Sequence, residues 1–184
     1  MGTHTRRGPV GDSYWLVEGK LLAGEYPGSY HPQVTRQKLS KFLNAGILTF
    51  VNLTETEEPL EPYADVLEEL AAERGIEVKH VRHPIRDVSV PRDREVMVGI
   101  LQTIRDEIAA GRPVYVHCWG GIGRTGTVIG CWLVEEGLSG PKAIARIAEL
   151  RKGTTDRYRR SPETDEQCDY ICGWSDGRAT KSGG

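Results

Sequence analysis

The sequence lacks a long hydrophobic run, a charge excess of either sign and a regular spacing of cysteines. No apolar stretch approaches the roughly 18 residues that a helix needs to cross a bilayer. The formal net charge is −2, so the chain has no overall attraction for a nucleic acid or an anionic membrane surface. Four irregularly spaced cysteines do not form a disulfide framework in a chain of 184 residues. We therefore expect neither a nucleic-acid partner nor a membrane partner.

The two ends of the chain differ from the region between them. The first ten residues are polar and lack the apolar core of a secretory signal peptide. Residues 1–11 and 175–184 are rich in small and polar side chains, so we expect a mobile N-terminus and a disordered tail. The length between them suits one domain, which we place at residues 12–174.

Hydrophobic periodicity in this region alternates between the strand and the helix patterns. A hairpin is predicted over 14–17 and 21–23. Further strands are predicted over 47–53, 76–81 and 114–117, and helices over 32–44, 62–74, 91–110, 125–136, 141–152 and 162–174. This alternation predicts an α/β fold, a single-domain three-layer sandwich with a central, mostly parallel, twisted sheet flanked by helices.

One segment joins the strand at 114–117 to the helix that follows it: His117-Cys118-Trp119-Gly120-Gly121-Ile122-Gly123-Arg124-Thr125-Gly126. The order places the Cys118 thiol beneath backbone N–H groups at a helix N-terminus, which binds anions and favours the thiolate. Glycines let the backbone of residues 119–123 close around an oxyanion. The Arg124 guanidinium matches two phosphate oxygens at once. The segment therefore predicts a nucleophile inside a phosphate cradle.

Three other interpretations of this segment are weaker. Gly121-x-Gly123-x-x-Gly126 matches a dinucleotide-binding fingerprint, but a second strand ending in an acidic residue does not follow. A nucleotide phosphate loop needs a lysine before its serine or threonine, and none is present. A buried structural cysteine explains Cys118 but not the glycines and Arg124 together.

The segment resembles the signature of the cysteine-dependent protein tyrosine phosphatases, His-Cys-x5-Arg-Ser/Thr, at every required position. The Gly-Gly pair inside the loop is most similar to the dual-specificity branch, near the cyclin-dependent-kinase-associated phosphatases. The resemblance extends from about Trp15 to Trp174. It implies the phosphatase fold, a Cys118 nucleophile, phosphate binding by Arg124, and no cofactor or metal.

The resemblance also implies a general acid on a loop upstream of the signature. Asp87 lies in the matching segment, between a strand and a helix-starting Pro91. A loop aspartate that caps a turn is the plainer interpretation. Asp93 is the rival candidate, but it is expected inside the next helix as a solvated first-turn charge.

Three further residues receive supporting roles. The Thr125 hydroxyl is placed to stabilise the departing thiolate. His117 resembles the histidine that orients the loop by hydrogen bonding. Gln167 resembles a glutamine that in some relatives orients the hydrolytic water.

Several polar groups remain open to two interpretations. Ser161 and Pro162 are a good N-cap and first position for the last helix. Arg157, Arg159 and Arg160 either recognise a second phosphate or acidic neighbours of the substrate, or form a solvated loop. The acidic side chains after the strand at 47–53 are expected to form a solvated face: Glu55, Glu57 and Glu58.

Together these features predict a phosphatase of phosphotyrosine, extending to phosphoserine and phosphothreonine, that works through a phosphocysteine. The expected partner is a phosphorylated protein, and the expected compartment is the cytoplasm, which keeps thiols reduced. The alternatives are a phosphatase of a phosphoinositide, a nucleotide or an RNA 5′-end, and a phosphopeptide-binding module. The loop side chains of Trp119 and Ile122 argue against a polyanionic head group, and the intact Cys118, Arg124 and Asp87 argue against a module. The natural substrate and the oligomeric state stay open.

Overall fold

Five strands form one sheet in the order β1-β2-β5-β3-β4 in a computed structural model that describes residues 7–174. The strands are β1 (Ser13–Val17), β2 (Leu21–Gly24), β3 (Thr49–Asn52), β4 (Lys79–Arg82) and β5 (Val114–His117). β1 runs antiparallel to β2, and every other pairing is parallel. The predicted α/β fold with a mostly parallel sheet is confirmed.

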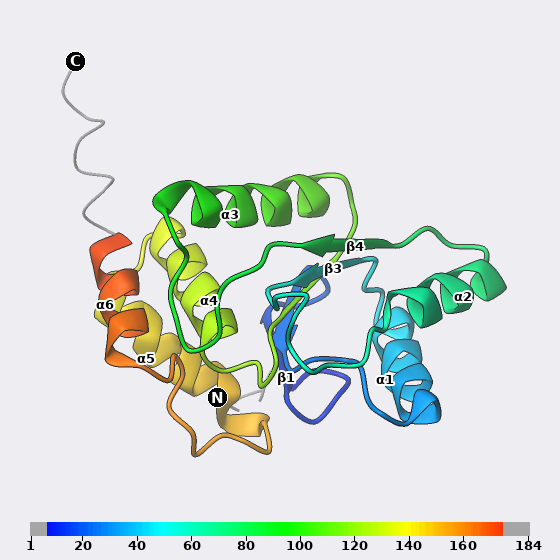
Figure 1. Cartoon of the computed structure of the whole chain (residues 1–184). Coiled ribbons are helices and arrows are strands. Elements are labelled where there is room, and N and C mark those ends of the chain that lie inside the picture. The colour runs from blue at the N-terminus through cyan, green and yellow to red at the C-terminus, as the bar shows by residue number, and fades with distance from the viewer. Residues whose placement is uncertain (1–6, 175–184) are drawn as a thin grey trace.

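Within residues 7–174, six α-helices cover the two faces of the sheet. They are α1 (Pro32–Asn44), α2 (Ala64–Arg74), α3 (Arg94–Ala109), α4 (Arg124–Glu135), α5 (Gly140–Leu150) and α6 (Asp165–Trp174). A short 3-10 turn, η1 (Arg151–Gly153), follows α5. Figure 1 shows α1 and α2 on one side of the strands and α3 to α6 on the other. The arrangement is the predicted three-layer sandwich.

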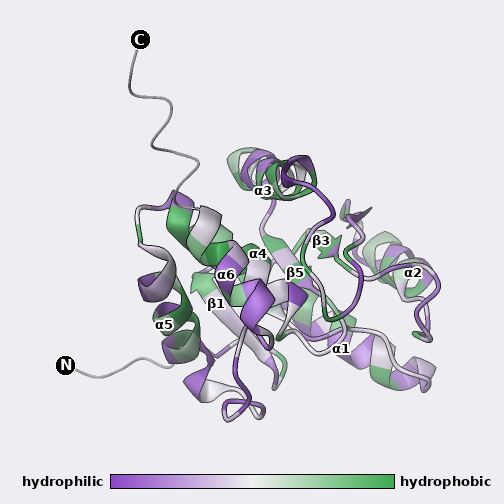
Figure 2. Cartoon of the chain, turned by 60° about the vertical axis from the view of Figure 1, so that its left-hand side comes forward, coloured by the Kyte–Doolittle hydropathy of each residue, from purple (hydrophilic) through white to green (hydrophobic). Residues whose placement is uncertain are grey.

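The side chains of β5 divide the core into two parts. Tyr115 packs with Phe42 and Phe50 beneath α1 and α2, whereas Val114 and Val116 belong to the larger cluster beneath α3 to α6. Successive strand residues point to opposite faces, so a short fully buried strand supplies both layers. Figure 2 shows hydrophobic and hydrophilic residues alternating along the outer helices α1 and α2, as one-sided burial requires.

The parallel strands bring four chain segments to one edge of the sheet. His117 at the end of β5 pairs in register with Gly24 of β2 and with Asn52 of β3. Asn52 in turn pairs with Arg82 at the end of β4. Ligands of parallel sheets bind outside the carboxyl ends of the strands, so the loops that follow these residues surround Cys118.

Two helices begin three residues later than predicted. Asp93 was expected inside the helix that starts at Pro91, but it is the N-cap of α3 and its carboxylate accepts from Val96 N at 3.1 Å. The last helix was expected to begin at Pro162 with Ser161 as its N-cap, and this is wrong. α6 begins at Asp165, because Thr164 just before it and Gln167 in its first turn form a reciprocal capping box.

The predicted mobile N-terminus falls only partly within the described residues. Arg7 forms a bridge with Tyr14, and Val10 is only 9% exposed, so this part packs against the domain. Residues 1–6 and the predicted tail at 175–184 lie outside the described residues. Within residues 7–174, no helix combines the length and the apolarity that a membrane span needs.

Candidate active site

Cys118 lies at the base of a cavity of about 240 Å³ and is 3% exposed. It follows β5 directly, and the loop from it leads into the N-terminus of α4. The cavity is lined by Asp87, Val88, Cys118, Trp119, Gly120, Ile122, Gly123, Arg124, Arg159 and Glu163. The fold therefore brings the predicted nucleophile, acid and arginine to one cavity.

The loop from Cys118 to Arg124 is held in place by residues outside the loop. Tyr26 N donates to Trp119 O at 2.8 Å, and the Ser161 hydroxyl donates to Ile122 O at 2.7 Å. Gly121 has φ +70°, and a Cβ there would lie 2.2 Å from the carbonyl carbon of Gly24. The loop thus keeps its shape through contacts with two segments that are distant in the sequence.

The Arg124 guanidinium is 1% exposed and is held by three groups. It makes a two-pronged ion pair with Glu58, in which Nη2 donates to Oε2 at 3.0 Å. Nη1 donates to Ile85 O at 3.0 Å, and Nη2 lies 3.0 Å from Asp87 Oδ1. Its Nε is buried and has no hydrogen-bond partner in the described part of the chain.

Glu58 is the largest departure of the site from the sequence prediction, which placed it on a solvated face. Its side chain is 10% exposed because it lies against Arg124. Burial is the largest single influence on Glu58 and opposes its charged form, but the hydrogen bonds from Arg124 and from the Glu55 backbone, together with the charges of Arg124 and Arg82, outweigh it and the pKa of this carboxyl falls. Burial is also the largest single influence on Arg124 and opposes its charge, but the hydrogen bond to Glu58 and the charges of Cys118, Glu58 and Asp87 together raise the pKa of the guanidinium.

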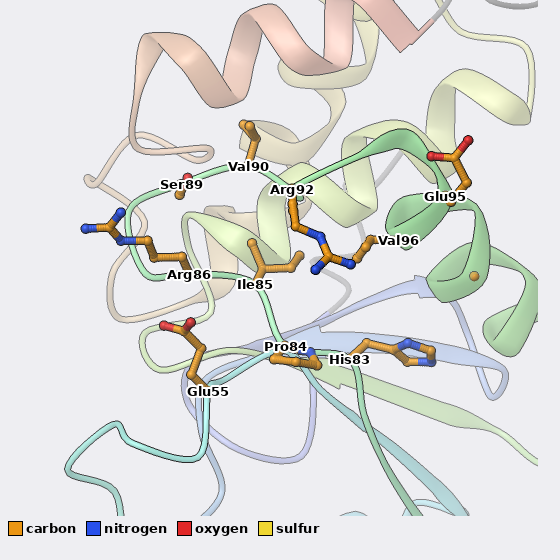
Figure 3. Close-up of a pocket in the computed structure, with 11 residues that line it drawn as sticks. Glu55, His83, Pro84, Ile85, Arg86, Ser89, Val90, Arg92, Glu95 and Val96 are labelled. Atoms are coloured by element: carbon orange, nitrogen blue, oxygen red, sulfur yellow. The ribbon is translucent and has the colours of Figure 1, made fainter.

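Asp87 lies on the loop between β4 and α3, and its side chain is 48% exposed. Val88, next to it, has φ +58°, a left-handed conformation that strains a β-branched residue. A second cavity of about 620 Å³ lies behind this loop, between Ile85, Val90 and the start of α3 (Figure 3). The loop that carries Asp87 therefore has open space on both sides.

His117 is fully buried and hydrogen-bonded at both ring nitrogens. Burial lowers its pKa to about 3, so the ring is neutral at physiological pH. Nδ1 lies 3.2 Å from Cys118 O, which can only accept, so Nδ1 carries the proton. Nε2 then accepts from the Tyr63 hydroxyl at 2.6 Å. Tyr63 was not singled out from the sequence, and it fixes the tautomer that supports the Cys118 carbonyl.

The other two supporting residues differ in how free their side chains are. The Thr125 hydroxyl is buried without a hydrogen-bond partner among the described residues. Gln167 is fully buried, and both ends of its amide are engaged: Oε1 accepts from Thr164 N at 3.2 Å and Nε2 donates to Ser89 O at 3.1 Å. Gln167 thus ties α6 to the loop that carries Asp87.

Glu163 enters the cavity although the sequence did not mark it. Its Oε1 lies so close to Gly123 that a Cβ on that glycine would be 2.2 Å away. Within residues 7–174, no cluster of three or more histidine, cysteine or carboxylate side chains is arranged to hold a metal ion. The ionisable groups that line the cavity are the Cys118 thiol, the carboxyl groups of Asp87 and Glu163, and the guanidinium groups of Arg124 and Arg159.

A family model described as "Swiss Army Knife protein, DSP-PTPase phosphatase domain" matches residues 12–167. Tyrosine-protein phosphatase cdc-14 of Caenorhabditis elegans is 38% identical over 157 residues, which are 78% of this chain and 20% of that protein. Dual specificity protein phosphatase CDC14B of Mus musculus is 26% identical over 161 residues, 82% of this chain and 30% of that protein. The chain spans about half or less of the length of these curated relatives.

Solved structures agree with the family match. Tk-PTP in its active form is 28% identical with a TM-score of 0.64, and the match covers 88% of this chain and 95% of that one. Kinase associated phosphatase shares the fold at 20% identity, with a TM-score of 0.68 over 87% of this chain and 88% of that one. PTPMT1 in complex with PI(5)P does so at 18% identity, with a TM-score of 0.65 over 90% and 96%.

The chain belongs to the cysteine-dependent protein tyrosine phosphatase superfamily, in its dual-specificity branch. The resemblance that the signature at 117–126 predicted is confirmed.

Proposed function

We propose that this chain hydrolyses phosphate monoesters on protein side chains, phosphotyrosine above all, through a phosphocysteine at Cys118. The observation that carries the proposal is the cavity at the N-terminus of α4. There the Cys118 thiol, the buried Arg124 guanidinium and the Asp87 carboxylate line one space of about 240 Å³. This is the set of groups that phosphoryl transfer to a thiol requires.

In the first step the Cys118 thiolate attacks phosphorus, and the bond from phosphorus to the leaving oxygen breaks. The backbone N–H groups of residues 119–124 and the Arg124 guanidinium stabilise the charge on the three equatorial oxygens. Asp87 gives its proton to the leaving oxygen. The products are the free alcohol or phenol and a phosphocysteine.

In the second step water attacks the phosphocysteine, and the S–P bond breaks. Asp87, now a carboxylate, takes a proton from this water. The Thr125 hydroxyl, which has no hydrogen-bond partner in the described part of the chain, is available to donate to the sulfur as the thiolate departs. Inorganic phosphate leaves, and the thiolate is restored.

A bound substrate phosphate has to replace one of the present partners of the Arg124 guanidinium. Nε and Nη2 form one edge of the guanidinium. Nε has no hydrogen-bond partner within residues 7–174, and Nη2 lies 3.0 Å from Asp87 Oδ1. A phosphate that takes this edge in a two-pronged contact displaces Asp87 from Nη2, while Glu58 keeps its own contacts. The displaced Asp87 is then free to turn to the leaving oxygen.

The side chains of the loop favour a substrate with one scissile phosphate on an apolar group. The two side chains between Cys118 and Arg124 are apolar: Trp119, which is 47% exposed at the rim, and Ile122, which is buried. The loop therefore has no lysine that could bind the extra phosphates of a polyphosphorylated head group. The phosphoinositide in the PTPMT1 complex is the reason to test lipid phosphates as the competing class.

The decisive experiment compares substrates under one set of conditions. The kcat/KM values of a phosphotyrosine peptide, a phosphothreonine peptide and phosphatidylinositol 5-phosphate are measured with wild type and with Cys118→Ser. We expect the phosphotyrosine peptide to have the highest value and Cys118→Ser to be inactive on all three. A higher kcat/KM for the lipid would contradict the proposal of a protein substrate. Turnover by Cys118→Ser would contradict the proposed mechanism.

A further inference from the structure

Arg82 is the last residue of β4, and its guanidinium reaches the loop that follows the neighbouring strand β3. The two strands lie side by side (Figure 1), and Arg82 pairs in register with Asn52 at the end of β3. Arg82 Nη1 donates to Thr54 O at 3.1 Å and to the Thr54 hydroxyl at 3.4 Å. One nitrogen of this guanidinium therefore contacts two oxygen atoms of the same loop residue.

Thr54 is held by residues at the ends of two adjacent strands, and it is only 1% exposed. Asn52 Oδ1 accepts from Thr54 N at 2.9 Å and from the Thr54 hydroxyl at 2.7 Å. Asn52 is itself fully buried, and its Nδ2 donates to His80 Nε2 at 3.2 Å. The backbone of Thr54 is thus bonded at its N–H by Asn52 and at its C=O by Arg82.

The peptide unit between Thr54 and Glu55 connects Arg82 with Glu58. Its oxygen is the one that Arg82 contacts, and its N–H, on Glu55, donates to Glu58 Oε1 at 2.8 Å. The C=O and the N–H of a planar trans peptide point in opposite directions, so a rotation of this unit would disturb both contacts. A charged donor on the oxygen also strengthens the N–H as a donor to the carboxylate.

Glu58 passes this orientation on to the phosphate site. Its Oε2 accepts from Arg124 Nη2 at 3.0 Å, and Arg124 Nη1 donates to its Oε1. A turn of the Glu58 carboxylate would therefore change the direction in which the Arg124 guanidinium presents its free edge. Arg82 lies outside the set of described residues that line the catalytic cavity.

We propose that Arg82 is a positioning residue for the reaction at Cys118, because it orients the Glu58 carboxylate that holds Arg124. It acts through the peptide unit of Thr54 and Glu55 and does not contact the substrate. The proposal rests on the proposed function of the Cys118 site and adds to it a residue of β4. Loss of Arg82 weakens the hold of Arg124 on a phosphate, and with it both substrate binding and turnover.

The first test measures kcat/KM for an aryl phosphate. Arg82→Gln should lower it about three- to tenfold, because a neutral amide binds Thr54 O more weakly than a guanidinium does. Arg82→Lys should stay within about twofold of wild type, because a single nitrogen makes both contacts with Thr54 and an ammonium can replace it.

Lys79→Gln is the matched control, because Lys79 lies at the other end of β4 and pairs with Glu107 at 2.8 Å. This change weakens the same strand without reaching Thr54, so kcat/KM should stay within about twofold of wild type. Thermal unfolding shows which variants are folded. Equal kinetics of Arg82→Gln and Lys79→Gln would overturn the proposal.

A double-mutant cycle with Glu58 separates positioning from a general effect on the fold. When Glu58→Gln is already present, Arg82→Gln should cost less than about twofold in kcat/KM, because the carboxylate that Arg82 orients has gone. Losses that multiply in full would overturn the proposal. Arg82→Met, which keeps the apolar stem of the side chain and removes the donor, replaces Arg82→Gln in the cycle where the amide variant does not fold.

A binding measurement distinguishes this proposal from the proposed function. Calorimetric titration of Cys118→Ser with inorganic phosphate needs no turnover, and adding Arg82→Gln should weaken the affinity about three- to tenfold. An unchanged affinity would overturn the role of Arg82 and leave the proposed function standing. Aryl phosphate turnover by Cys118→Ser would overturn the proposed function, whereas the calorimetric result would still decide whether Arg82 orients the phosphate site.

Discussion

The position and the orientation of the Arg124 side chain are determined by different parts of the chain. Its position after the phosphate loop follows from the local sequence. Its orientation depends on Glu58, which lies 66 residues earlier, after β3. Acidic residues in a loop are usually solvated, and nothing in the run Glu55, Glu57 and Glu58 distinguishes the one that turns inward. A partner fixed only by the folded sheet could not be predicted from the sequence.

Glu58→Gln should lower kcat/KM by about tenfold or more, because a neutral amide no longer holds the guanidinium with two charge-assisted hydrogen bonds. The stability should fall by about 1–3 kcal/mol, since Arg124 stays buried with a weaker partner. Steady-state kinetics and urea unfolding measure the two effects. Glu57→Gln is the control, because Glu57 is exposed and its side chain accepts a hydrogen bond from the neighbouring Thr56 hydroxyl. Equal effects of the two changes would contradict the role of Glu58.

Asp87→Asn should depend on the leaving group. The loss should be large, about 10²-fold or more, for a phosphotyrosine peptide, whose phenol needs a proton. It should be small for an aryl phosphate whose phenol leaves unaided. Asp93→Asn should lose little on either substrate, because Asn also caps α3. Equal losses on both substrates for Asp87→Asn would make Asp87 a structural loop residue.

Among the elements, the helices and strands follow from the hydrophobic pattern, whereas the starts of α3 and α6 do not. Ser161-Pro162 has the composition of a helix start, but the Ser161 hydroxyl is taken by Ile122 O of the phosphate loop. The capping groups of α6 are Thr164 and Gln167 instead. The sequence alone does not show that the hydroxyl of one of two nearby capping residues, Ser161 and Thr164, is bonded to a distant loop and so is not available to cap the helix.

The phosphate loop gives a matched pair of glycine substitutions. Gly121→Ala should destabilise the domain by more than about 2 kcal/mol and abolish activity. A Cβ at φ +70° would meet the Gly24 backbone at 2.2 Å, which cannot retreat without moving β2. At Gly120 the nearest atom to a Cβ is 3.7 Å away, so Gly120→Ala should keep the stability. Thermal unfolding compares them, and an equally stable Gly121→Ala would mean that the loop is not held against β2.

Across the whole domain, two buried groups on opposite ends of the sheet make the fold sensitive to acid. Burial lowers the pKa of His117 from 6.5 to about 3. At the other end, the hydrogen bond from Arg112, with Lys79 and Thr49, lowers the pKa of Glu107 from 4.5 to about 2. In both cases the unfolded chain binds more protons between the two values, so stability is lost as the pH falls.

Acid unfolding should therefore occur in two windows, from about pH 6.5 downward for His117 and from about pH 4.5 to 2 for Glu107. Glu107→Gln should cost about 1–3 kcal/mol at pH 7, because it weakens the contacts with Lys79 and Arg112. Its difference from wild type should shrink as the pH falls through the second window. Glu149→Gln, an exposed pair with Lys152, should follow wild type throughout. A pH-independent difference for Glu107→Gln would refute the assignment.

The central claim is that the Cys118 sulfur carries the phosphoryl group during turnover. Rapid acid quenching of wild type with a phosphotyrosine peptide, followed by mass spectrometry of the peptide that contains Cys118, tests it directly. The account predicts a phosphorylated Cys118 in wild type that accumulates when Asp87 is replaced by Asn with a fast-leaving aryl phosphate. It also predicts no phosphorylated residue and no turnover in Cys118→Ser. Phosphate on another side chain, or turnover that persists in Cys118→Ser, would contradict it.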